Sequence, residues 1–252
     1  FSNSLALISD GVHMAMDVGA LFVSLFAVWL SSRPAQSGYT YGYQRVEILG
    51  ALLNGLTIWL ISGFLVYESY RRFSAPPDVR AGWVIGIGSL GLIANLVSLK
   101  FLHGAQKENL NVRSAYLHVL TDCLGSVAAI LSGVIIQFTG WKLVDPILTC
   151  VFSILMLWGS WRLVREAVEV LMERSPSGVD LDRIEKSLLS ISGVSGLHDL
   201  HVWTLSSGRI ALSVHLRRVS EVTDLNESQT LSQANELLAK DFGITHSTIQ
   251  IE

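Results

Sequence analysis

The sequence has 252 residues, of which 50% are hydrophobic and only 15% are charged, and its mean hydropathy is +0.45. Soluble domains carry nearer a quarter charged residues, so this composition predicts membrane-spanning segments. The net charge of −3 provides no strong basic field for nucleic acid. Two cysteines, Cys123 and Cys150, lie in apolar stretches and suit neither a disulfide scaffold nor a cysteine metal site.

Five stretches are apolar enough to cross a bilayer, which takes about 20 mostly apolar residues. We expect these spans at 4–30, 46–70, 82–102, 112–138 and 144–171. Lys and Arg are richer in the connections after the first and third spans and after the fifth, which places these parts and the C-terminus in the cytoplasm. Phe1 then lies outside, which fits a chain that begins after a first helix.

The sequence changes to a soluble pattern after Arg174, so we expect a membrane domain of 1–173 and a second domain of 174–252. Periodicity predicts a helix at 179–192, strands at 197–205 and 209–216, a helix at 225–240 and a strand at 244–251. This order indicates a small α+β domain of the split-βαβ kind that lacks a first strand. A domain of about 75 residues has a small hydrophobic core, so we expect it to pack against a second copy of the chain.

Two of the predicted spans carry the same pair of ionisable residues. His13 and Asp17 lie four apart in the first span, and His118 and Asp122 lie four apart in the fourth. Residues at this spacing share one face of a helix. A charged residue at mid-membrane costs about 3 kcal/mol even on a permissive scale, so two such pairs indicate a function. A hydrogen bond within each helix is the structural alternative.

These four side chains match the chemistry of a zinc site. Imidazole nitrogens and carboxylate oxygens are tetrahedral zinc ligands, and two carboxylates would neutralise the charge of the ion. Without thiolates, the set suits Zn²⁺ or Co²⁺ better than Cu⁺. Because ligands must lose protons to bind metal, exchange of metal for protons follows as a mechanism.

Other ionisable residues leave more than one interpretation open. Asp10 lies three residues before His13 near the outer end of the first span, where a helix-end or water-facing role is as plausible as a metal role. In the soluble part, His198 and Leu200 of a regular strand would face one way, with Asp199 and His201 facing the other. The spacing of the soluble histidines alone does not define a site.

Five blocks of the sequence resemble the cation diffusion facilitator family of metal/proton antiporters, and especially its bacterial members tied to cobalt, zinc and cadmium resistance. The blocks cover essentially the whole chain, in the family's order: residues 4–17, 39–47, 109–118, 198–203 and 246–252. The resemblance implies six membrane helices, of which this chain holds the second to the sixth. It also implies a cytoplasmic ferredoxin-like domain, a homodimer and location in the bacterial inner membrane.

The resemblance also implies functional residues. The transport site would consist of His13, Asp17, His118 and Asp122, with histidine at the first position favouring zinc over cadmium. Further zinc would bind the cytoplasmic domain, where the matching or nearby positions are His198, His215, His246 and Glu252. The chain departs from some members in the connection after the first span, where Tyr39 and Tyr43 stand at the places of metal-binding histidines.

The expected function is therefore export of zinc, with cobalt and cadmium as further candidate ions, in exchange for protons by alternating access. A membrane-anchored metal sensor is the alternative, and flux measurements separate the two. An intramembrane metalloenzyme needs a motif such as His-Glu-x-x-His and an open coordination position, neither of which the predicted site offers. We therefore expect no enzyme activity.

Overall fold

The computed structural model describes residues 2–105, 110–206, 208–218 and 227–252, with the backbone alone for residues 104, 105, 110–115, 117 and 118. Ser207, which lies between the two predicted strands 197–205 and 209–216, and the start of the predicted helix 225–240 lie outside these ranges. The chain forms two compact units. The first consists of Phe1–Val23 with Leu53–Leu163, and the second of Ser24–Leu52 with Val164–Glu252.

Five helices of the described chain are long and apolar enough to cross a membrane, as predicted. The helix α2 extends four residues past its predicted end at Tyr70, and α3 extends three residues past Leu102. In the added turn of α2, Arg71 and Arg72 form ion pairs with Glu68 at 3.1 and 3.2 Å, which favour the helix slightly. The helices are α1 (Leu5–Ser31), α2 (Val46–Ser74), α3 (Ala81–Ala105), α4 (Leu110–Thr139) and α5 (Val144–Leu171).

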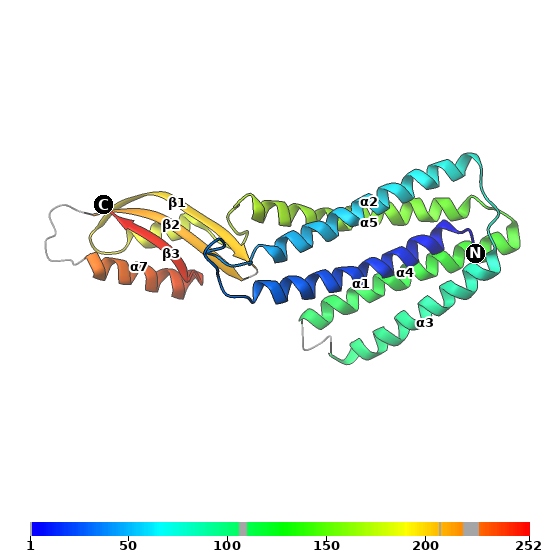
Figure 1. Ribbon diagram of the computed structural model, residues 1–252, viewed down its shortest axis with the longest axis horizontal. Helices are drawn as coiled ribbons and strands as arrows, with labels where there is room; N and C mark the ends of the chain where they lie inside the picture. The colour runs from blue at the N-terminus through cyan, green and yellow to red at the C-terminus, as the bar shows by residue number, and fades with distance from the viewer. Residues whose placement is uncertain (1, 106–109, 207, 219–226) are drawn as a thin grey trace. The chain divides into compact units, whose positions relative to one another are not determined.

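Glycines bring α3 and α4 close together, and the two helices lie side by side in Figure 1. A Cβ atom at Gly88 would lie 3.0 Å from Ile130, and one at Gly133 would lie 2.8 Å from Ile85. Small residues drive helix packing in lipid because they allow such contact.

The first unit exposes apolar side chains and buries polar ones. Phe101 and Phe138 are 81% and 83% exposed, whereas Asp145 and Ser126 are fully buried. This pattern fits a helical bundle with lipid as its solvent, in which polar groups must find partners inside. The buried polar residues are therefore the candidates for the functional site.

The end of the second unit is a three-stranded sheet with two helices, α6 and α7, on one face. Antiparallel β1 and β2 form a hairpin, and β3 pairs parallel to β2 after the α7 crossover (Figure 1). This is the predicted order of elements. Their bounds are α6 (Leu181–Leu189), β1 (Val194–Ser206), β2 (Arg209–Arg218), α7 (Glu227–Phe242) and β3 (His246–Ile251).

The core of this domain lies between the helices and one face of the sheet. Leu188 of α6 and Leu238 of α7 are fully buried against alternate residues of β2 such as Leu212 and Leu216. His215 lies between these positions in β2, so its side chain points to the opposite face. The helices thus leave that face of the sheet open for the histidines.

A bulge in β1 overturns the predicted alternation around His198. Asp199 has a φ of +51°, and the pairing with β2 shifts register between His198 and His201. Leu200 packs against the core, whereas His198 stays opposite His215. The expectation that His198 and Leu200 share a face is wrong because the bulge adds one residue to the strand.

Candidate metal centres

Three of the four predicted transport-site residues lie together inside the first unit. His13 Nε2 on α1 lies 3.9 Å from Asp17 Oδ2 and 3.4 Å from Asp122 Oδ1 on α4. Ligand atoms from all three residues lie within 4.8 Å of one another. With metal bonds of about 2.0–2.1 Å, two ligand atoms of a tetrahedral site lie about 3.3 Å apart, so the group can close on one ion.

The fourth residue, His118, has a described backbone but its side chain lies outside the described part of the structure. Its backbone belongs to α4, four residues before Asp122, which places both on the same helix face. Its role as a ligand stays a prediction.

Asp10 is buried, which corrects the water-facing interpretation of this residue. It is only 6% exposed, and its Oδ2 accepts a hydrogen bond of 3.1 Å from the Ser126 hydroxyl. Ser126 lies one helical turn after Asp122, as Asp10 lies about one turn before His13. The Asp10–Ser126 pair therefore repeats the α1–α4 contact of the metal-binding group one turn away.

Asp145 is a buried carboxylate that sequence analysis did not single out. It accepts hydrogen bonds from the Ser4 and Ser132 hydroxyls and from the backbone amides of Leu5 and Ala6. An acidic residue in the first turn of α5 suggests a role at the start of its own helix. No local signal reveals that it binds the start of α1, about 140 residues away in sequence.

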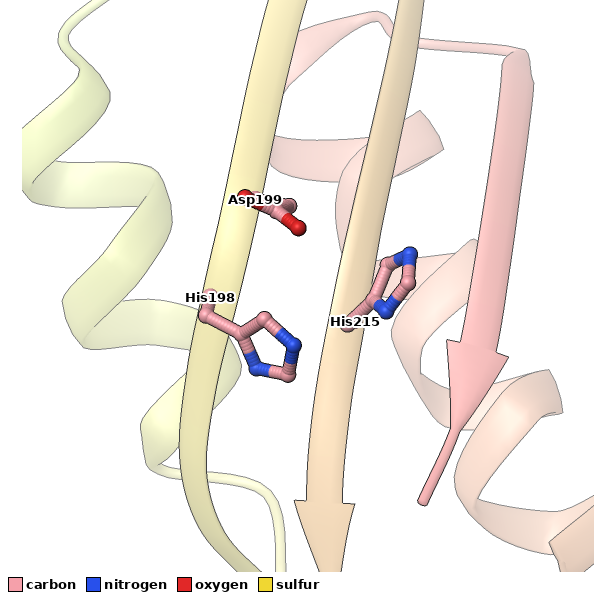
Figure 2. A group of neighbouring side chains, drawn as sticks. All are labelled: His198, Asp199 and His215. Carbon is pink, nitrogen blue, oxygen red and sulfur yellow. The ribbon is translucent and has the colours of Figure 1, made fainter.

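A second group of possible ligands lies on the open face of the C-terminal sheet. His198 and His215 are direct partners on β1 and β2, with ring centroids 4.9 Å apart. Figure 2 shows both rings beside the Asp199 carboxylate, and one ligand atom from each of the three residues lies within 4.8 Å of the others. Asp199 joins this group through the bulge, which the sequence pattern did not reveal.

Glu252 lies beside the two histidines, whereas His246 lies apart from them. Glu252 Oε1 lies 2.9 Å from His215 Nδ1, and Oε2 lies 3.6 Å from His198 Nε2. His246 pairs with Ala211, four positions along β2 from His215. That separation is about 13 Å in a strand, so the structure does not bring His246 to the other predicted ligands.

Comparison with known proteins identifies the family over almost the whole chain. The cation efflux transmembrane domain model matches residues 1–172, and the model of the cation efflux protein cytoplasmic domain matches residues 176–252. The chain belongs to the cation efflux family. This confirms the resemblance inferred from the five sequence blocks.

Several relatives match all of this chain and most of their own length. The metal cation efflux system protein CzcD of Cupriavidus metallidurans is 41% identical, over 79% of its length. A cadmium, cobalt and zinc/H⁺-K⁺ antiporter of Bacillus subtilis is 40% identical, over 81%. The zinc transporter ZitB of Pectobacterium atrosepticum is 38% identical, over 78%. The metal-bound C-terminal domain of the Cupriavidus CzcD transporter is a similar solved structure, with 43% identity over 29% of this chain and 99% of that domain and a TM-score of 0.27.

Membership of the cation efflux family makes the chain a transporter and not an enzyme. Its five apolar helices and cytoplasmic C-terminal domain make it an inner-membrane protein with several spans. The predicted fold class, a membrane helical bundle followed by a small α+β domain, is confirmed.

Proposed function

We propose that the chain exports zinc from the cytoplasm in exchange for protons, and that the ion binds between α1 and α4. The proposal is carried by the distance of 3.4 Å between His13 Nε2 and Asp122 Oδ1. This short distance brings a possible nitrogen ligand on α1 next to a carboxylate on α4. Groups that are costly in lipid are expected to mark an ion pathway when they meet in this way.

The donor set favours zinc among the divalent ions. His13 would supply nitrogen, and Asp17 and Asp122 would supply oxygen and two negative charges that offset the charge of the ion. His118 is proposed as the fourth ligand on the strength of the family resemblance. Cobalt accepts similar ligands, and the name of the Bacillus subtilis antiporter supports cobalt and cadmium as further cargo.

Protons are proposed as the counter-substrate. The ligands of the site are carboxylates and imidazole, which bind either a metal ion or protons. Arrival of the next ion expels these protons, because the ligands bind metal only when deprotonated. Rocking of the helices around a fixed site would then open it alternately to each side.

The cytoplasmic domain, proposed as residues 174–252, would bind a further zinc ion and join two copies of the chain. His198, His215 and Glu252 are the proposed ligands, with Asp199 added on the basis of Figure 2. The domain has a small core and belongs to the dimer-forming cytoplasmic domain of the family, which supports a homodimer. Metal binding there would affect transport only through different affinities for the two transport states.

Transport into liposomes tests the proposal. Purified chain should move Zn²⁺ across the membrane with protons in the opposite direction, and Asp122→Ala should abolish both fluxes. Asp78→Asn, which removes an exposed carboxylate between α2 and α3, is the matched control and should transport as the wild type does. Zinc flux at the wild-type rate in Asp122→Ala would refute the site, and binding without flux in the wild type would favour a sensor.

A further inference from the structure

Polar residues recur at helical-turn spacing along the contact between α1 and α4. Asp122 meets His13, and one turn further along α4 Ser126 donates its hydrogen bond to Asp10. Three residues separate Asp10 from His13, which corresponds to about 4.5 Å of helix rise. A second buried carboxylate therefore lies next to the transport site, toward the start of α1.

A small cavity adjoins this carboxylate. Its polar lining consists of Ser9 and Asp10 of α1 and Thr149 of α5, and the rest is Gly125 and apolar side chains such as Phe152. About 10 Å³ is open to the centre of a water-sized sphere, which is enough for about one water molecule. Gly125 leaves room for the carboxylate, because a Cβ atom there would lie 2.9 Å from Asp10 Oδ1.

One hydroxyl group that lines the cavity has no hydrogen-bond partner among the described residues. Ser9 is only 3% exposed, and in the described part of the chain its Oγ has no hydrogen-bond partner. Such a group is costly unless something occupies the space that it faces. Thr149 donates its proton to the Asp145 carbonyl at 2.9 Å, and Ser126 donates to Asp10. The lone pairs of both hydroxyls remain free to coordinate a cation.

We propose that Asp10, with the hydroxyls of Ser9, Ser126 and Thr149, forms a second cation station that holds the divalent ion after it leaves the transport site. The inference rests on the proposed function. The Lys and Arg distribution places the start of α1 outside, so Asp10 lies on the outer side of His13. An ion moving outward therefore reaches Asp10 next.

The chemistry of the station suits release better than capture. It offers one carboxylate and hydroxyl oxygens, whereas the transport site offers the His13 imidazole and two carboxylates. Zinc binds imidazole more tightly than hydroxyl oxygen, and the smaller negative charge lowers the affinity further. The station gives the ion an intermediate binding position between the high-affinity transport site and the outer water. It therefore raises the rate at which the ion is released and leaves the affinity of the transport site unchanged.

Asp10→Asn tests the carboxylate in the reconstituted full chain. Asparagine keeps the size of the side chain and can still accept from Ser126, but it removes the charge. We expect the maximum rate of zinc transport to fall about tenfold, a usual effect of residues around a metal site. The zinc concentration for half-maximal rate should stay within about twofold, because the transport site is intact. A loss of zinc affinity like that of Asp122→Ala would overturn the proposal by making Asp10 a ligand of the transport site.

Ser9→Ala separates a cation station from a purely structural contact. Removing a buried hydroxyl that lacks a partner should leave the melting temperature unchanged or raise it. The station nevertheless predicts slower zinc transport in this variant. Ser153→Ala is the matched control, because Ser153 on α5 is equally buried and unpartnered among the described residues but does not line the cavity. Wild-type rates in both Ser9→Ala and Asp10→Asn would overturn the station.

The ratio of proton flux to zinc flux identifies what the station carries. If it carries the metal ion, Asp10→Asn slows both fluxes by the same factor and the ratio is unchanged. A lower ratio at an unchanged zinc affinity would show that Asp10 carries the proton instead and would overturn the proposal. The wild type is measured in the same vesicles. Absence of zinc flux there refutes the proposed function, whereas normal wild-type flux with unaffected variants refutes the station alone.

Discussion

The Asp145 carboxylate of α5 accepts a hydrogen bond of 2.5 Å from the hydroxyl of Ser4, the residue just before α1. It also accepts from the backbone amides of Leu5 and Ala6 at 2.6 and 3.3 Å, so one helix caps the start of another. The negative charge lies at the positive end of the α1 dipole and is shielded from solvent. This contact fixes the beginning of the helix that carries His13.

Asp145→Asn should destabilise the membrane domain. The amide retains one acceptor oxygen but turns an NH₂ donor toward groups that are themselves donors. Loss of buried hydrogen bonds to a charged group costs about 2 kcal/mol or more in the free energy of unfolding. Thermal unfolding of the purified chain in detergent measures the effect, with Glu236→Gln, a change at an exposed residue of α7, as control. Equal melting temperatures for the wild type and Asp145→Asn would show that the cap contributes nothing.

His13→Ala should weaken zinc binding at the transport site. It removes the nitrogen ligand that lies 3.4 Å from Asp122, and we expect the dissociation constant to rise at least about tenfold. Calorimetric titration of the full chain with Zn²⁺ gives the affinity. Met14→Ala changes the adjacent, partly exposed residue of the same helix and should bind zinc as the wild type does. Equal losses in both variants would indicate disturbance of α1 and not loss of a ligand.

The sequence predicted the helix faces of the membrane domain but not which helices meet. A spacing of four residues places His13 and Asp17 on one face, and hydropathy locates their span. Contact of α1 with Asp122 depends on packing between distant segments, which periodicity within one helix cannot determine. The family resemblance supplied that contact. The family resemblance did not include Asp145, and its hydrogen bond with Ser4 became evident only in the folded chain.

The C-terminal domain shows a different limit of sequence analysis. Alternation located β1 and β2, and in the folded domain Leu212 and His215 lie on opposite faces, as regular alternation requires. It did not locate the bulge at Asp199, because no glycine or proline marks that point in the strand. One added residue in the strand changed which side chains lie on the same face of the sheet as His198. A pattern with a period of two residues fails wherever the strand itself is irregular.

The ion pair of Asp78 with Lys142 predicts a pH dependence of stability. The Lys142 ammonium donates a hydrogen bond to the Asp78 carboxylate and holds the pKa of Asp78 below its usual value. The folded chain therefore favours the ionised carboxylate. The stabilisation is fully present above the unfolded pKa of about 4 and is lost as the pH falls through the lower folded pKa.

Melting temperatures of the wild type and Asp78→Asn across a pH series measure this contribution. The difference should be small, because both side chains are solvent-exposed, and constant from about pH 5 upward. It should shrink on further acidification. Growth of the difference toward low pH would contradict the sign of the pKa shift.

His198→Ala and His246→Ala distinguish the folded site from the sequence pattern. The family resemblance suggested both histidines, but only His198 lies beside His215 and Glu252. His198→Ala should therefore remove one zinc equivalent from the full chain, measured by native mass spectrometry. His246→Ala should retain it, because His246 lies about 13 Å along the sheet and its ring packs against Tyr41. Loss of zinc in His246→Ala alone would place the cytoplasmic metal at the other end of β2 and leave the His198 group as an ordinary polar cluster.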